Sequence, residues 1–212
     1  MNSREPILHR VRAALGRQEG QAPKTAPPVR LRIPEVILET RIASMTARLE
    51  ALAARVCRVP TSRAAGEWVS ETLANRTAVV SNAPYLDECG ITEFPNVHSG
   101  IHDRERLREL CATVDVGISS ADYLLADTGT LVLLSSAHEA RMISLLPPAH
   151  IAVVPCSRLL TGLDELFSLL PDPGSFASSM VLITGPSRTA DIEQILVRGV
   201  HGPGQLTLVL VG

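Results

Sequence analysis

Residues 180–212 constrain the fold more than any other part of the chain. An apolar run at 180–184 is followed by a Gly-Pro turn, and a second apolar run occupies 206–211. Between the two runs, Ser187 and Thr189 are candidate helix caps and Gly199 is a candidate helix end. This order predicts a strand, a helix and a second strand, with polar residues at the strand-to-helix turn. In open parallel sheets, ligands bind at that edge of the sheet.

Strand and helix patterns also alternate along the preceding residues. Short apolar runs of strand length are separated by segments with helical periodicity, whereas segment 84–100 shows neither pattern. Residues 123–134 contain two apolar runs around an Asp-Thr-Gly-Thr turn, which predicts a hairpin. The alternation predicts an α/β fold with a mostly parallel, Rossmann-like sheet flanked by helices.

A long helix is expected near the start of the globular part. Its apolar residues follow heptad spacing; they are Leu38, Ile42, Met45, Leu49, Leu52 and Val56. This spacing fits a coiled-coil dimer, or a helix packed on the core of its own domain, which is commoner in mixed proteins. We therefore expect an α/β domain at residues 34–212. Residues 1–33 are expected to form an amphipathic helix and a Pro-rich linker. This basic arm is either a solvated tail or a contact for a partner or a membrane surface.

The composition excludes several classes of function. Hydrophobic residues make up 45% of the chain but aromatic residues only 3%, so few side chains can stack on bases. The formal net charge of −2 also argues against a nucleic-acid partner. No apolar stretch is long enough to span a membrane. Lys24 is the only lysine, and it lies in the linker, which excludes a Walker-A phosphate loop and makes Schiff-base chemistry implausible.

The cysteine pattern indicates a cytoplasmic protein without a metal site of its own. The cysteines are scattered and form no Cys-x-x-Cys pair, which argues against an iron–sulfur cluster or a zinc knuckle. No secretory apolar region precedes them, so a reducing compartment is expected. His98 and His102 have a zinc-like spacing, but no third ligand lies nearby; segment 138–141 and His150 are weaker candidates. No Gly-x-Gly-x-x-Gly turn follows a strand, so no dinucleotide cofactor is expected.

Three polar turns are candidate binding or catalytic sites. The first is the predicted helix start, where free N–H groups and a guanidinium can hold an anion; its residues are Gly185, Pro186, Ser187, Arg188, Thr189, Asp191 and Glu193. The second is the hairpin turn, formed by Asp127, Thr128, Gly129 and Thr130. The third contains His201 and Gly202. Asp127 or His201 can transfer a proton. Each turn also has a purely structural explanation, as a helix cap or an ordinary turn.

Together, these turns and their flanking residues carry a more specific signal than any one of them. Four segments contain it: ISSADYLLADTGTLVL (118–133), SLLPPAHIAVVP (144–155), TGPSRTADIE (184–193) and HGP (201–203). They closely resemble the lactate utilisation protein C family, the LUD domain group. The resemblance extends from about residue 34 to the C-terminus and is strongest from residue 114 onward.

The resemblance implies a fold like that of the sugar-phosphate isomerase and coenzyme A transferase superfamily. It also implies a role in oxidising L-lactate to pyruvate together with two partner proteins, which carry the iron–sulfur clusters. Coenzyme A transferases of the superfamily use a Glu in a Glu-x-Gly loop, and this chain has Asp127-x-Gly129 at a similar loop. We therefore expect a subunit that binds a small anionic or acyl ligand. The alternatives are a non-catalytic scaffold and a stand-alone enzyme acting on a phosphorylated or thioester substrate.

Overall fold

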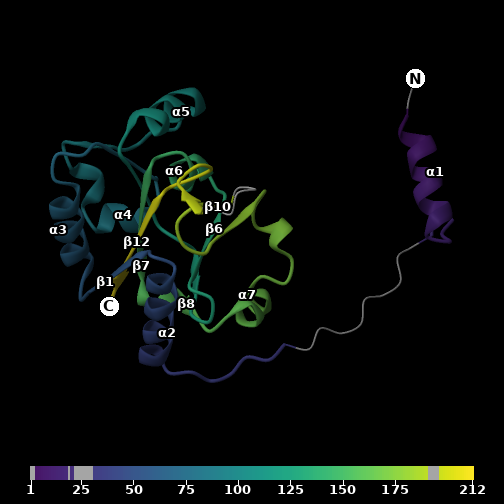
Figure 1. Ribbon diagram of the computed structural model, residues 1–212, viewed down its shortest axis with the longest axis horizontal. Coiled ribbons are helices and arrows are strands. Elements are labelled where there is room, and N and C mark those ends of the chain that lie inside the picture. Colours follow the sequence, from purple (N-terminus) through teal and green to yellow (C-terminus); the bar gives the residue numbers. More distant parts are fainter. Residues whose placement is uncertain (1–2, 19, 22–30, 191–195) are drawn as a thin grey trace. The chain divides into compact units, whose positions relative to one another are not determined.

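The computed structural model describes residues 3–18, 20–21, 31–190 and 196–212 (Figure 1). The chain divides into two compact units, Met1–Arg30 and Leu31–Gly212. The first unit contains helix α1 (Arg4–Ala14), which buries none of its residues. The second unit holds every other helix and every strand of the described residues.

The centre of the second unit is a six-stranded sheet in which every pair of neighbouring strands is parallel. The strand order is β1 (Arg55–Val59), β12 (Gln205–Val211), β7 (Ala149–Pro155), β4 (Val116–Ser119), β2 (Ala78–Val80) and β3 (Val97–His98). Central strands β4 and β7 consist almost entirely of buried residues, as expected for strands covered on both faces. The predicted mostly parallel α/β fold is confirmed.

Helices cover both faces of this sheet. Helix α3 (Ser62–Leu73) and the short helix α4 (Pro84–Glu88) contribute Val69, Leu73 and Leu86 to the core on one face. On the other face, Ile42, Met45 and other residues of α2 (Leu38–Ala51) pack into the core. The apolar side of α2 therefore belongs to its own domain, and the helix ends before Val56, which lies in β1.

A second, four-stranded sheet lies over the same face as α2. Its order is β8 (Leu159–Leu160), β5 (Tyr123–Leu125), β6 (Thr130–Leu134) and β9 (Met180–Ile183). Strands β5 and β6 form the predicted antiparallel hairpin. Helix α7 (Leu163–Leu169) packs on this sheet through Leu166. The remaining short segments are the 3-10 turns 91–93, 156–158 and 173–175.

The predicted strand–helix–strand unit at the C-terminus is wrong. Strand β9 pairs antiparallel with β6 in the second sheet. Of the residues expected to be helical, those that the structure describes include the antiparallel strands β10 (Arg188–Ala190) and β11 (Leu196–Arg198). The capping residues that suggested a helix are also typical of turns. The following Ile-Leu-Val run suits a strand at least as well as a helix, because β-branched side chains favour extended backbone.

Two further short elements frame the sheet edge described below. Helix α5 (Arg104–Thr113) begins with the Asp103 carboxylate accepting a hydrogen bond from the backbone N–H of Arg106 at 2.8 Å. Helix α6 (Arg141–Leu145) lies against β4, where Gly117 allows the close approach. Segment 84–100, which had no clear pattern, contains α4, a 3-10 turn and β3. Within the described residues, no helix has the length and hydropathy needed to cross a membrane.

Candidate functional site

Two of the three predicted turns meet at one cavity of about 200 Å³, here called the histidine cavity. Gly185, Pro186 and Ser187 line it together with His201 and Gly202. The backbone N–H of Ser187 donates to the carbonyl of Pro203 at 2.9 Å, so one hydrogen bond joins the two turns directly. Buried His150, at the start of β7, lines the same cavity.

The anion site predicted at this turn relied on the free N–H groups of a helix start. The turn leads instead into strand β10, so the described residues provide no helix start there. Arg188 and Thr189 belong to β10, and the Arg188 guanidinium donates to the backbone carbonyl of Leu52 at the end of α2. Asp191 and Glu193 lie outside the described residues. The remaining backbone N–H groups of the turn do not benefit from a helix dipole.

The hairpin turn touches the histidine cavity only indirectly. Asp127 and Thr128 are exposed, and neither lines the cavity. The Asp127 carboxylate packs directly on Gly162, where a Cβ atom would lie 2.4 Å from its Oδ2. Gly129 is buried against α2. The link to the cavity is Thr130, whose Oγ1 lies 2.7 Å from Oγ1 of Thr184.

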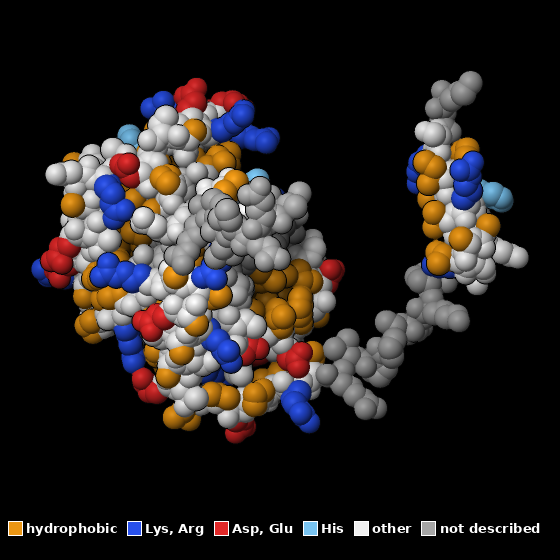
Figure 2. All heavy atoms as spheres, viewed as in Figure 1, with side chains coloured by type: hydrophobic (Ala, Val, Ile, Leu, Met, Phe, Trp, Pro, Cys, Tyr) orange, Lys and Arg blue, Asp and Glu red, His pale blue; other side chains and the backbone are white. Residues whose placement is uncertain are grey.

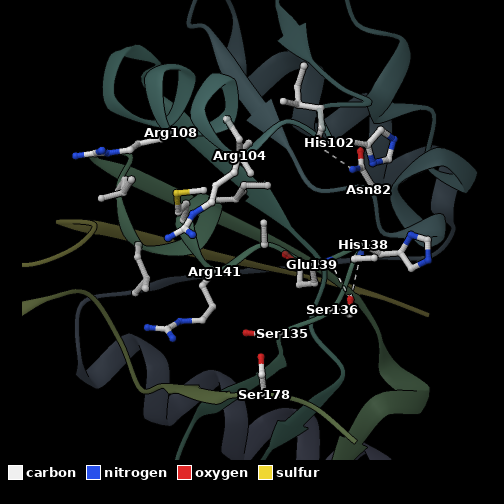
Figure 3. Close-up of a pocket in the computed structure, with 18 of the residues that line it drawn as sticks. Asn82, His102, Arg104, Arg108, Ser135, Ser136, His138, Glu139, Arg141 and Ser178 are labelled. Carbon is white, nitrogen blue, oxygen red and sulfur yellow. Dashed lines mark hydrogen bonds between the residues drawn. The ribbon is translucent and has the colours of Figure 1, made fainter.

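A larger cavity of about 950 Å³, here called the arginine cavity, lies beside α5 and α6. Three arginines line it: Arg104 and Arg108 on α5, and Arg141 at the start of α6. Figure 3 shows the arginines on one side of the cavity and Asn82, His102 and His138 on the other, with Glu139 between them. None of the three guanidinium groups forms an ion pair or hydrogen bond with the part of the chain that the structure describes.

Glu139 is the only acid in the described chain that is buried, with 7% of its surface exposed. Its Oε2 accepts a hydrogen bond from the Ser81 hydroxyl at 2.8 Å, whereas Oε1 has no hydrogen-bond partner among the described residues. Burial raises the pKa of Glu139 to about 8, and the Ser81 hydroxyl and the nearby Ser120 amide offset only part of this rise. At neutral pH the carboxyl group is therefore largely protonated.

The turn before α6 holds Glu139 in place through short-range hydrogen bonds. Ser136 Oγ accepts from the backbone N–H groups of His138 at 3.1 Å and Glu139 at 3.0 Å. The backbone N–H of Asn82 donates to the carbonyl of His138 at 2.9 Å. The carboxyl end of β2 is thereby tied to the turn, which brings Ser81 within reach of the carboxyl group.

The arginine cavity combines positive charge with a group that can exchange a proton. Guanidinium groups bind carboxylates and phosphates through paired hydrogen bonds. A protonated carboxyl group can donate a hydrogen bond or a proton to a bound ligand, and a strongly raised pKa in a cavity is a common property of functional acids. The exposed Glu105 also lines the cavity and reduces its net positive charge.

Sequence reasoning missed the arginine cavity because its residues are scattered among ordinary turns and helix surfaces. One signal was available: Ser81 and Asn82 follow β2, and Ser119 and Ser120 lie at the end of β4. Polar residues at the carboxyl ends of neighbouring parallel strands mark the edge at which ligands bind. His102 also lies at this edge, but within the described residues no group of three His, Cys, Asp or Glu side chains is placed to hold a metal ion.

Comparison with known proteins identifies the family. A family model described as the LUD domain matches residues 42–211. A protein named lactate utilization protein C, from Halalkalibacterium halodurans, is 38% identical over 68% of this chain and 66% of its own length. A protein of the same name from Geobacillus sp. is 29% identical over 100% of this chain and 96% of its own length.

The fold is also found in a solved structure. A DUF162 family protein from Deinococcus radiodurans has a TM-score of 0.61 with 17% sequence identity, over 84% of this chain and 100% of that chain. At this identity the likeness concerns the fold alone. The chain spans about two thirds of the Halalkalibacterium relative and almost the whole of the Geobacillus relative. Because the family model matches most of its length, the chain belongs to the LUD domain family.

Proposed function

We propose that this protein takes part in lactate utilisation and binds a small carboxylate or acyl metabolite in the arginine cavity. The observation that carries the proposal is the set of three guanidinium groups, without partners among the described residues, beside the buried carboxyl group of Glu139. The arginines hold the negative charge of the ligand, and Glu139 exchanges a proton with its hydroxyl or carbonyl oxygen. The names of the relatives support the link to lactate.

The electron transfer itself belongs to other proteins in this proposal. The scattered cysteines suit a cytoplasmic subunit that works beside iron–sulfur partner proteins in oxidising lactate to pyruvate. Of the two residues first expected to move a proton, His201 lies at the histidine cavity and Asp127 at neither cavity. Glu139 therefore takes the role that the sequence had suggested for them.

A binding experiment tests the proposal. Pyruvate, L-lactate and inorganic phosphate are titrated into the protein near pH 7, and binding is followed by calorimetry and by the melting temperature. A ligand at 100 times its dissociation constant adds about 2.7 kcal/mol to the free energy of unfolding. We expect Arg141→Gln to weaken binding at least ten-fold, because a charged hydrogen bond is worth about 1.5–3 kcal/mol.

The matched control is Arg63→Gln on α3, where an exposed arginine pairs with Glu67. This variant should bind as the unmodified protein does. The proposal fails if neither pyruvate nor L-lactate binds, or if the Arg141→Gln and Arg63→Gln variants bind them with the same affinity. Slower growth on lactate with Arg141→Gln, but not with Arg63→Gln, would link the cavity to lactate utilisation.

One observation favours a scaffolding role as a second candidate. Helix α1 leaves Ile7 and Val11 exposed, Leu15 at its C-cap is also exposed, and basic side chains lie on the same short helix (Figure 2). An apolar stripe of this kind suits binding to a partner subunit. If scaffolding is the whole function, Arg141→Gln leaves growth on lactate unchanged, whereas replacing Ile7 and Val11 by Ser abolishes it.

A further inference from the structure

We infer that the histidine cavity is a second binding site, for a small uncharged molecule that donates a hydrogen bond to Nδ1 of His150. The site is separate from the arginine cavity, although Leu145 of α6 lines both. Its volume of about 200 Å³ is far more than one water molecule needs and suits a compact organic ligand. The inference does not depend on the anion-binding function proposed above.

The segments that carry the family resemblance converge on this cavity. Segment 144–155 supplies Ser144 and His150, segment 184–193 supplies its Gly-Pro-Ser turn, and segment 201–203 supplies the facing turn. Segment 118–133 does not line the cavity but supports two residues that do: the Ser119 side chain is hydrogen-bonded to His150, and the Thr130 side chain to Thr184. The arginine cavity explains none of these contacts.

The hydrogen bonds around His150 determine which ring nitrogen carries the proton. Ser119 Oγ lies 2.8 Å from Nε2 of His150 and 2.8 Å from the carbonyl oxygen of Ser120. A carbonyl can only accept, so the single hydroxyl hydrogen points to Ser120, and Nε2–H donates to the hydroxyl oxygen. Nδ1 is therefore a bare acceptor.

This acceptor is buried and unsatisfied. His150 is 1% exposed, and its Nδ1 has no hydrogen-bond partner in the described part of the chain. An unsatisfied buried polar atom is costly, so a native protein normally supplies it with a partner. A ligand hydroxyl or N–H group in the cavity would supply one.

The cavity is suited to an uncharged ligand. Burial lowers the pKa of His150 to about 4, so the ring is neutral at physiological pH. Among the described lining residues, only His150 and the exposed His201 are ionisable, and Arg188 is held by the carbonyl of Leu52. Leu145, Leu206 and other apolar side chains form much of the wall. An anion would lose its hydration there without gaining a fixed counter-charge.

Phenol and toluene provide a direct test, because they have similar size and only phenol donates a hydrogen bond. Each is titrated into the full chain labelled with ¹⁵N-histidine, and the ring nitrogens are observed by NMR. We expect phenol to bind at least ten-fold more tightly and to shift the Nδ1 resonance of His150, with Nε2 remaining protonated. Equal affinities, or an Nδ1 resonance that phenol does not move, would overturn the inference. The inference would also be overturned if pyruvate bound as tightly as phenol and shifted the same Nδ1 resonance.

Two glycine substitutions locate the binding. Gly202→Leu places a side chain at the cavity wall, where a Cβ atom lies 3.4 Å from Cβ of Ser187, an ordinary contact. Gly204→Leu is the matched control in the same turn, outside the cavity lining, with a nearest contact of 3.5 Å. Phenol binding should be lost in the first variant and kept in the second. Binding that survives Gly202→Leu overturns the assignment, and the comparison of phenol with toluene needs no variant at all.

Discussion

The Glu139 carboxyl group should make the stability of the protein fall as the pH rises. Its pKa is about 8 in the folded protein and near 4.5 when the chain is unfolded, so the folded state holds the proton more tightly. The stabilisation is complete below pH 4.5 and is lost as the pH rises towards 8. The Gln side chain of Glu139→Gln cannot ionise, so its free energy of unfolding should not fall in this way. Measured by urea unfolding, the difference from the unmodified protein should change in favour of the variant by up to about 1.4 kcal/mol per pH unit in this window.

Ser81→Ala provides the control for that measurement. The Ser81 hydroxyl favours the ionised form of Glu139, so its removal should raise the pKa further and extend the loss of stability to higher pH. The two variants should therefore change the pH profile in opposite directions. Parallel profiles for all three proteins would mean that Glu139 does not titrate as a buried acid.

At the scale of elements, the position of α6 depends on the absence of a side chain at Gly117. A Cβ atom there would lie 1.9 Å from the carbonyl oxygen of Ile143, so Gly117→Ala must push α6 away from β4. Such overpacking typically costs about 1–3 kcal/mol. Because α6 carries Arg141, we also expect pyruvate to bind at least ten-fold more weakly, as measured by calorimetry.

Gly66→Ala separates this effect from a general loss of stability. Its Cβ atom would lie 2.1 Å from the carbonyl oxygen of Cys89, so a similar cost arises between α3 and α4, on the opposite face of the sheet. This variant should be destabilised yet bind pyruvate normally. Equal binding by Gly117→Ala and Gly66→Ala would contradict the dependence of the arginine cavity on α6.

Elements with a clear pattern in their own residues could be predicted, and elements whose position depends on a distant partner alone could not. The turn residues between β5 and β6 are enough to predict that hairpin, and the spacing of Ile42 and Met45 is enough to predict the buried face of α2. Strand β9 instead pairs with β6, with Ile183 opposite Leu131. Nothing in the local pattern of residues 180–199 indicates that partner, so a parallel strand followed by a helix was the natural but wrong interpretation.

At the scale of the whole molecule, one of the two cavities could be predicted in part from sequence and the other could not. Two turns that line the histidine cavity were candidate sites from sequence, because their Gly-Pro and His-Gly-Pro motifs are easily recognised as turns. The arginine cavity depends on Ser81 meeting Glu139 across 58 positions of sequence. Burial of a carboxyl group is a property of the assembled core, and a Glu before a short helix has no sequence pattern that marks it as buried.

The division of the chain into two units leads to a last prediction. Helix α1 buries none of its residues, and among the residues that the structure describes, the four hydrophobic clusters of the domain contain no residue before Ile42. Removing residues 1–30 should therefore cost little free energy of unfolding and change the melting temperature by no more than about 1 °C. A loss of about 1 kcal/mol would lower the melting temperature of a domain of this size by about 2–4 °C. Pyruvate affinity should also be unchanged, whereas growth on lactate should fall if α1 recruits a partner. A drop of several degrees in a calorimetric scan would instead show that the first unit contributes to the stability of the domain.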